Sequence, residues 1–158
     1  MIAAGELAPS FVGTAADGTA LDFAAYRGRP VVLYFYPKAN TTGCTAEARA
    51  FTLNYPELEK AGIALVGVSV DSVEDQKSFS QKCGLPFPLV ADHDKSIAKQ
   101  YGVLGLLGFS KRVTFFIEPD GRVAEVVQGM LPGPHVRRAV ERARARAGAT
   151  TSNHSRSK

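Results

Sequence analysis

The sequence predicts an α/β sandwich, in which helices flank a mixed central sheet and a β-hairpin stands at the N-terminus. Runs of β-branched and aromatic residues, typical of buried strands, alternate along the chain with segments that carry helix start and stop signals. A turn sequence joins the last two predicted strands, which makes part of the sheet antiparallel. The 158 residues suffice for one domain and contain no internal repeat. Together these observations predict an α/β domain with a mixed sheet.

The first elements follow from a turn and one long apolar run. Residues 16–19 (Ala-Asp-Gly-Thr) are typical of a hairpin turn and predict strands at residues 10–14 and 20–23. Residues 31–36 (Val-Val-Leu-Tyr-Phe-Tyr) are apolar without alternation, as expected of a central strand buried on both faces. Pro37 ends this strand because proline has no amide hydrogen to donate.

The first long helix is predicted directly after this strand. Thr41, Thr42 and Gly43 are its start signals, and we expect the helix to contain Cys44 and to run to about Leu53.

A second buried strand is predicted at residues 63–70. The next helix begins after an N-cap offered by Asp71-Ser72, with acidic residues 74–75 in its first turn, where the helix dipole favours negative charge. It should end at residues 82–83, because Gly84 is a suitable C-cap.

The remaining strands are shorter. Residues 87–90 predict a strand and residues 93–101 a helix that Gly102 stops. Residues 113–117 and 123–127 predict a hairpin around a Glu-Pro-Asp-Gly turn.

The C-terminal segment is rich in Ala and Arg and predicts a helix from Pro134 to about Ala147. The small, polar residues 148–158 are predicted to form a disordered tail. The predicted domain therefore covers residues 1–147.

The net charge of +4 is concentrated at the C-terminus, since residues 134–158 hold seven Arg and Lys against one Glu. The rest of the chain is nearly neutral and carries no nucleic-acid recognition motif, so we expect a solvated helix face and no nucleic-acid partner. No stretch is apolar and long enough for a membrane helix, and no secretory signal is recognisable. These features predict a cytoplasmic protein without a membrane partner.

The two cysteines, Cys44 and Cys83, do not form a CxxC pair, which argues against zinc binding and against an ordinary dithiol reductase. No histidine lies at metal-ligand spacing, so no metal site is predicted. Cys44 is the candidate nucleophile because the first turn of a helix points unpaired amides and a positive dipole end at its sulfur. These favour the thiolate, which is the reactive form. Gly43 would let the backbone approach closely.

The spacing of Pro37, Thr41 and Cys44 spells P-x-x-x-T-x-x-C and resembles the active-site signature of peroxiredoxins. With Phe51 added, the longer match resembles the Q-type group, also called bacterioferritin comigratory protein. The resemblance covers about residues 1–147, including segments 87–92 and 112–117. It implies a thioredoxin-like fold and a thiol peroxidase that needs no metal or organic cofactor. By the same resemblance, thioredoxin is the expected reductant and the protein is expected to be a monomer.

The resemblance also assigns roles to single residues. Thr41 would orient the peroxide through a hydroxyl that both donates and accepts, with a plain helix N-cap as the alternative role. Pro37 would shield the sulfur from solvent. Arg112 is the expected active-site cation, because it begins a strand predicted to lie beside the strand of residues 31–36. Glu47, three residues after the cysteine, would hold this arginine in place. The alternatives are a surface arginine and an exposed helix glutamate.

The implied reaction is attack of Cys44 on peroxide, which leaves a sulfenic acid that a second thiol converts to a disulfide. Two departures from the family pattern bear on that second thiol. Thr42 stands where the family often has proline, and Arg49 stands where many members carry the resolving cysteine. Cys83 is then the candidate resolving residue, although the family's cysteine on that helix aligns about one turn earlier, at Ser80. A one-cysteine enzyme with a structural Cys83 remains the alternative.

Other classes of function are also compatible with a single reactive cysteine. A non-catalytic thiol redox sensor could use the same residue, and a thioredoxin-like disulfide reductase would share the fold but require CxxC. Peroxide turnover distinguishes the peroxidase from both.

Overall fold

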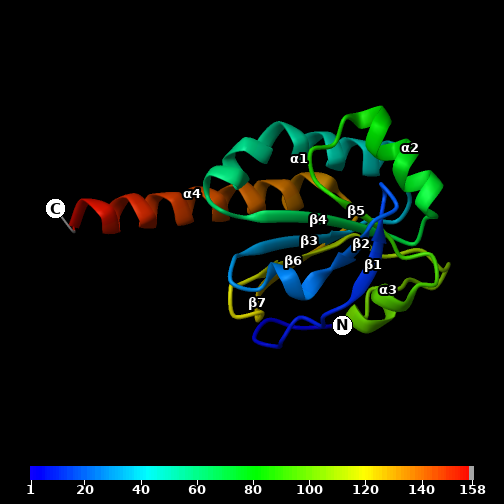
Figure 1. Ribbon diagram of the computed structural model, residues 1–158, viewed down its shortest axis with the longest axis horizontal. Coiled ribbons are helices and arrows are strands. Elements are labelled where there is room, and N and C mark those ends of the chain that lie inside the picture. Colours follow the sequence, from blue (N-terminus) through cyan, green and yellow to red (C-terminus); the bar gives the residue numbers. More distant parts are fainter. Residues whose placement is uncertain (157–158) are drawn as a thin grey trace.

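The computed structural model describes the backbone of residues 1–156 and the side chains of residues 1–148. Within this part of the chain, seven strands form one mixed sheet in the order β2-β1-β5-β4-β3-β6-β7 (Figure 1). The strands are β1 (Val12–Ala15), β2 (Ala20–Asp22), β3 (Val31–Phe35), β4 (Ala64–Ser69), β5 (Leu89–Ala91), β6 (Val113–Ile117) and β7 (Val123–Gln128). The predicted α/β class and the N-terminal hairpin are confirmed.

Helices cover both faces of the sheet, as Figure 1 shows. One face carries the long helices α1 (Thr42–Lys60), α2 (Val73–Cys83) and α4 (Pro132–Arg156). The other carries the short helix α3 (Ser96–Tyr101) and the 3₁₀ turn η1 (Phe23–Tyr26). Among the described residues, no helix is both long enough and apolar enough to cross a membrane.

Strand β3 lies in the middle of the sheet, parallel to β4 and antiparallel to β6. Its side chains alternate between two apolar cores: Val32 and Tyr34 face the long helices, whereas Leu33 and Phe35 face α3. Both faces are covered, which explains the unbroken apolar run. Phe35 pairs with Val113, so the start of β6 lies beside the end of β3, as the sequence predicted.

Several local predictions are confirmed. The Ser72 side chain accepts a hydrogen bond from the Asp75 amide at the start of α2, and Gly84 ends that helix in the left-handed conformation with φ 59°. Gly121, with φ 88°, donates its amide hydrogen to Glu118 in the turn between β6 and β7.

Helix α1 is longer than predicted, because it continues past Leu53 to Lys60 and contains Pro56. The predicted end rests on local propensity, but Leu58 is fully buried against the sheet in the second half of the helix. Burial of this side chain favours helix strongly enough to offset the missing hydrogen bond of one proline.

Helix α3 begins at Ser96 and not at His93. The Asp92 carboxylate accepts hydrogen bonds from the Ile97 and Ala98 amides, and Lys95 has a left-handed φ of 67°. The chain therefore turns before the helix starts.

Helix α4 differs from the prediction at both ends. It begins at Pro132, two residues before Pro134, because proline is well tolerated in the first turn. It continues past Ala147 to Arg156, since residues 148–156 contain no proline to stop it. Residues 157–158 of the predicted tail lie outside the described residues, and the mobility of residues 148–158 in solution stays a prediction.

Candidate active site

Cys44 lies in the first turn of α1, directly after the loop that leaves the end of β3. The residue is 2% exposed and belongs to the apolar core beneath the long helices. Thr41 is the N-cap, so the sulfur belongs to a turn whose amides have no partners within the helix. The buried sulfur therefore lies at the N-terminal end of a helix, where the helix dipole favours negative charge.

Arg112 brings its guanidinium against this sulfur. Its Nη2 lies 3.5 Å from Cys44 Sγ, its Nη1 lies 2.5 Å from Glu47 Oε1, and its Nε donates to the Met130 carbonyl oxygen at 2.9 Å. Arg112 is buried, which excludes the surface-arginine alternative. The structure thus brings Arg112 to Glu47 and Cys44, which lie 65 and 68 positions away from it in the chain.

Glu47 is fully buried one turn after Cys44, so it is not an exposed helix glutamate. Burial raises the pKa of Glu47 to about 7, and the Arg112 guanidinium opposes that rise. Burial alone would lower the pKa of Arg112, but the charges of Glu47 and Cys44 raise it above its ordinary value. Within the described part of the chain, Glu47 Oε2 has no hydrogen-bond partner.

Gly43 provides the space for this contact. A Cβ atom at position 43 would lie 3.2 Å from Arg112 Nη2, closer than an ordinary van der Waals contact. The predicted close approach at Gly43 is therefore an approach of the arginine side chain to the helix backbone.

Thr41 and Pro37 both belong to the segment between the end of β3 and the first turn of α1. The Thr41 hydroxyl donates to the Lys38 carbonyl oxygen at 2.7 Å and makes no capping hydrogen bond, although Thr41 occupies the N-cap position. Its side chain is exposed and retains lone pairs for another donor. Pro37 is half-buried just after β3.

The loop between β3 and α1 is fastened by a residue for which the sequence suggested another role. The Asp71 carboxylate accepts hydrogen bonds from the Ala39 amide at 2.8 Å and from the Ser69 hydroxyl at 2.5 Å. In sequence, Asp71 together with Ser72 predicts the N-cap of α2. Its position at the end of β4, the parallel neighbour of β3, is the signal that could have placed it beside this loop.

Cys83 is the last residue of α2 and is half-buried against the same apolar core as Cys44. Both thiols are free. Both cysteines therefore lie on one face of the sheet, on separate helices.

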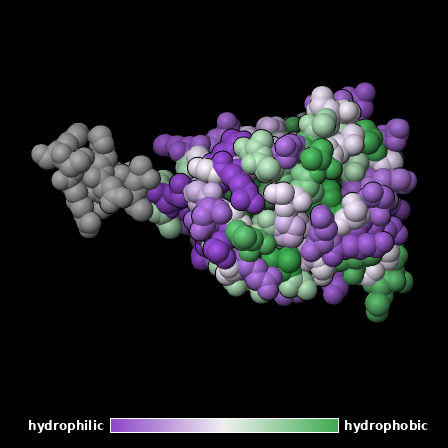
Figure 2. All heavy atoms as spheres, turned by 60° about the horizontal axis from the view of Figure 1, so that its bottom comes forward, coloured by the Kyte–Doolittle hydropathy of each residue, from purple (hydrophilic) through white to green (hydrophobic). Residues whose placement is uncertain are grey.

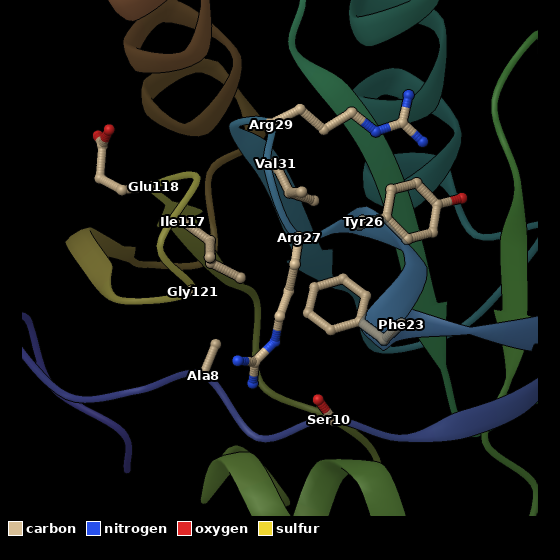
Figure 3. A pocket seen from close by; sticks show the side chains of 10 residues that line it. All are labelled: Ala8, Ser10, Phe23, Tyr26, Arg27, Arg29, Val31, Ile117, Glu118 and Gly121. Carbon is tan, nitrogen blue, oxygen red and sulfur yellow. The ribbon is translucent and has the colours of Figure 1, made fainter.

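A pocket lies at the other end of the sheet and is shown in Figure 3. Its lining includes Phe23, Arg27, Val31 and Ile117. Val31 pairs with Ile117 at the end of β3 and β6 opposite Phe35. This pocket is therefore separate from the reactive thiol.

Comparison with known proteins agrees with the geometry around Cys44. A family model described as AhpC/TSA matches residues 4–126. The putative peroxiredoxin bcp of Coxiella burnetii is 38% identical over 148 residues, which cover 89% of this chain and 98% of the relative. Peroxiredoxin Bcp of Escherichia coli is 35% identical over 139 residues, covering 84% and 89%.

Solved structures show the same likeness. Peroxidoxin BcpB from Mycobacterium tuberculosis superimposes with a TM-score of 0.85 at 33% identity, covering 92% of this chain and 98% of the other. Xanthomonas campestris peroxiredoxin Q gives a TM-score of 0.80 at 33% identity, covering 87% and 91%. With its thioredoxin-like fold, the chain therefore belongs to the AhpC/TSA family and is a peroxiredoxin of the Bcp or Q type.

Proposed function

We propose that Cys44 is the thiol with which this peroxidase attacks its substrate. The family establishes a thiol-dependent peroxidase that acts on a peroxide with a thiol reductant, which leaves the sensor and disulfide-reductase readings without support. The observation that carries the assignment to Cys44 is the 3.5 Å contact between its sulfur and Arg112 Nη2 in the first turn of α1. Cation and helix terminus together favour the nucleophilic thiolate.

The step is a displacement at oxygen. The Cys44 thiolate attacks one peroxide oxygen, the O–O bond breaks, and the second oxygen leaves as an alkoxide or hydroxide that takes up a proton. Hydrogen peroxide and organic hydroperoxides both fit this reaction. Arg112 stabilises the charge on the departing oxygen, and Glu47 fixes the arginine through Nη1.

Thr41 and Pro37 complete the proposed site. The exposed Thr41 hydroxyl orients the peroxide, since its hydrogen is given to the Lys38 carbonyl and its lone pairs are free to accept. Pro37 shields the sulfur without adding an amide donor.

Cys83 is the proposed resolving cysteine. Its thiolate attacks the Cys44 sulfenic acid, water leaves, and a disulfide forms. A disulfide requires Cα atoms about 4.4–6.8 Å apart. We expect the first turn of α1 and the end of α2 to unwind for it, with Gly43 and Gly84 easing the rearrangement.

The reductant we propose is thioredoxin, a dithiol protein that reopens the disulfide by exchange. We also propose a monomeric, cytoplasmic protein without a nucleic-acid partner. The monomer follows from the resemblance to the Q-type group; on the face shown in Figure 2, apolar residues lie among polar ones.

Two cysteine variants test this proposal. Cys44→Ser should abolish peroxide consumption in a thioredoxin-coupled assay while the circular dichroism spectrum stays native. Cys83→Ser, the matched control, should still reduce one equivalent of peroxide but fail to turn over. Near-normal turnover by folded Cys44→Ser contradicts the central assignment.

Mass spectrometry of the wild type after one equivalent of peroxide tests Cys83 separately. An intramolecular Cys44–Cys83 disulfide is expected. A persistent sulfenic acid on Cys44 beside a free Cys83 would show a one-cysteine enzyme.

A further inference from the structure

The Arg112 guanidinium is held on three sides, and one of these contacts comes from the loop between β7 and α4. Glu47 and Cys44 contact the two terminal nitrogens, whereas the Met130 carbonyl oxygen accepts from Nε at 2.9 Å. Because Nη1 and Nη2 are held by their own partners, the position of the Met130 carbonyl oxygen determines how the plane of the guanidinium group is turned.

Gly129, the residue before Met130, does not by itself fix the position of the Met130 carbonyl oxygen. Gly129 has a φ of 135°, a conformation that glycine adopts readily but does not prefer strongly over others. No atom lies within 4 Å of a Cβ built on Gly129, so steric packing does not confine this residue either. The Gly129 amide donates a long hydrogen bond of 3.3 Å to the Arg112 carbonyl oxygen. A further contact is needed to fix the backbone at Gly129, which leads into the Met130 carbonyl one peptide later.

His135 supplies that contact from the start of α4. Its ring is fully buried, with Nε2 2.8 Å from the Gly129 carbonyl oxygen and Nδ1 2.7 Å from the Thr114 hydroxyl. A carbonyl oxygen only accepts, so Nε2 carries the hydrogen and Nδ1 accepts from Thr114. Thr114 lies two residues after Arg112 on β6, on the same face of the sheet.

The charge state of the ring fits this arrangement. Burial lowers the pKa of His135, the positive charge of Arg112 lowers it further, and the hydrogen bond to Gly129 opposes both effects. The neutral imidazole fixes the loop without placing a second cation beside the guanidinium.

We propose that His135 is a positioning residue of the peroxidase: it anchors the Gly129 carbonyl, one peptide before the Met130 carbonyl that holds Arg112 Nε, and thereby orients Arg112. This role rests on the proposed function of Arg112 at the sulfur. His135 touches neither the sulfur nor the peroxide in this role. Its effect on the reaction should therefore vanish when the arginine is absent.

Two amide variants separate the role in positioning from general packing. His135→Gln retains a donor that can reach the Gly129 carbonyl, whereas the amide of His135→Asn is one methylene too short. The reduced proteins are mixed with hydrogen peroxide, and the second-order rate constant is measured by stopped-flow competition with a haem peroxidase. We expect the Asn variant to react about tenfold more slowly and the Gln variant to stay within about threefold of the wild type.

The same substitution in an Arg112→Ala background completes the test. There, His135→Asn should cause no further loss, because residues that act as a unit are not additive. Equal losses in both backgrounds, or equal losses for Gln and Asn, overturn the proposal and leave the role of Arg112 intact. A wild-type rate for Arg112→Ala alone overturns the role of Arg112 and this proposal with it. Circular dichroism checks folding, and His135→Leu replaces the Asn variant if that variant is unfolded.

Discussion

At the scale of single residues, the proposed chemistry depends on one buried cation with three contacts. Replacing Arg112 by Ala removes the donor beside Cys44 Sγ and leaves Glu47 without its partner. We expect the rate constant with peroxide to fall roughly 10²-fold, the loss typical of a transition-state donor. Alkylation of Cys44 by iodoacetamide at pH 7 should slow as well, because the positive charge 3.5 Å from the sulfur is removed.

Arg112→Lys is the control for charge alone. Lysine keeps the positive charge but cannot make the three contacts of the planar guanidinium, so an intermediate rate is expected. If the Ala variant matched the wild type in both peroxide and alkylation rates, Arg112 would have no part in the reaction.

Glu47 should impose a pH dependence on stability. Its pKa rises to about 7 on folding because the carboxyl group is buried. Between about pH 4.5 and pH 7 the unfolded chain has released this proton and the native protein still holds it, so the free energy of unfolding falls as the pH rises.

The Glu47→Gln variant has no carboxyl group that titrates at this position. The contributions of the other titratable groups to stability cancel when the two proteins are compared. Urea unfolding of both proteins at pH 5, 6, 7 and 8 should show the wild type losing stability relative to the variant up to about pH 7. A difference that stays constant with pH would mean that Glu47 ionises equally readily in the folded and unfolded chains.

The sequence led to Cys44 because its spacing from Pro37 and Thr41 follows the peroxiredoxin signature. It led to Arg112 because the strand that begins there was expected to lie beside the strand before Cys44. It led to Glu47 because this residue lies one turn after the cysteine. It did not indicate Met130 or His135, whose contacts depend on where a loop closes after β7. Asp71 was noted in the sequence but was assigned to the N-cap of α2. Its partner Ala39 lies 32 positions away in the chain, so no local pattern indicates their contact.

At the scale of elements, the loop between β3 and α1 is the part that Asp71 supports. Asp71→Ala leaves the buried Ala39 amide without an acceptor, which should lower the free energy of unfolding by about 1–3 kcal/mol. The peroxide rate should fall too, because this loop carries Thr41. Equilibrium unfolding and the rate assay measure the two effects.

Asp75→Ala is the matched control, since Asp75 is exposed in the first turn of α2. It should lower the free energy of unfolding by less than about 1 kcal/mol and leave the peroxide rate unchanged. Equal effects of the two substitutions would show that the loop does not depend on Asp71.

The ends of elements with strong local sequence signals were predicted correctly, whereas an end that depends on tertiary packing was not. The bounds of β6 and the two caps of α2 agree with the sequence, because a buried strand, a serine and a glycine each act locally. The end of α1 was wrong, because Leu58 packs against strands that are distant in sequence.

At the scale of the whole molecule, the proposed site lies on one face of the sheet, and the C-terminal helix α4 packs on the same face. Ala139, Val140 and Ala143 of α4 pack into its core. Deleting residues 149–158 leaves these contacts in place, so peroxide turnover should stay within about twofold of the wild type. The steady-state assay with thioredoxin measures this, and a large loss would assign a function to the removed segment.

The fold class was predictable because it depends on the alternation of strands and helices along the whole chain. The strand order was not, since it depends on which non-local pairs form: β1 inserts its hairpin beside β5, far along the chain from residues 12–22. Apart from the two hairpins, only the β3–β6 neighbourhood was anticipated.

Pro56 divides α1 into two parts, which affects how the helix unfolds locally. Proline has no amide hydrogen, so the Thr52 carbonyl lacks its usual helical partner and the hydrogen-bond ladder is interrupted there. Opening of the turns around Cys44 therefore need not spread to the final turns, where Leu58 is anchored in the core. The helix should behave as two cooperative units, with amide hydrogens of residues 45–51 exchanging with solvent well before those of residues 58–60.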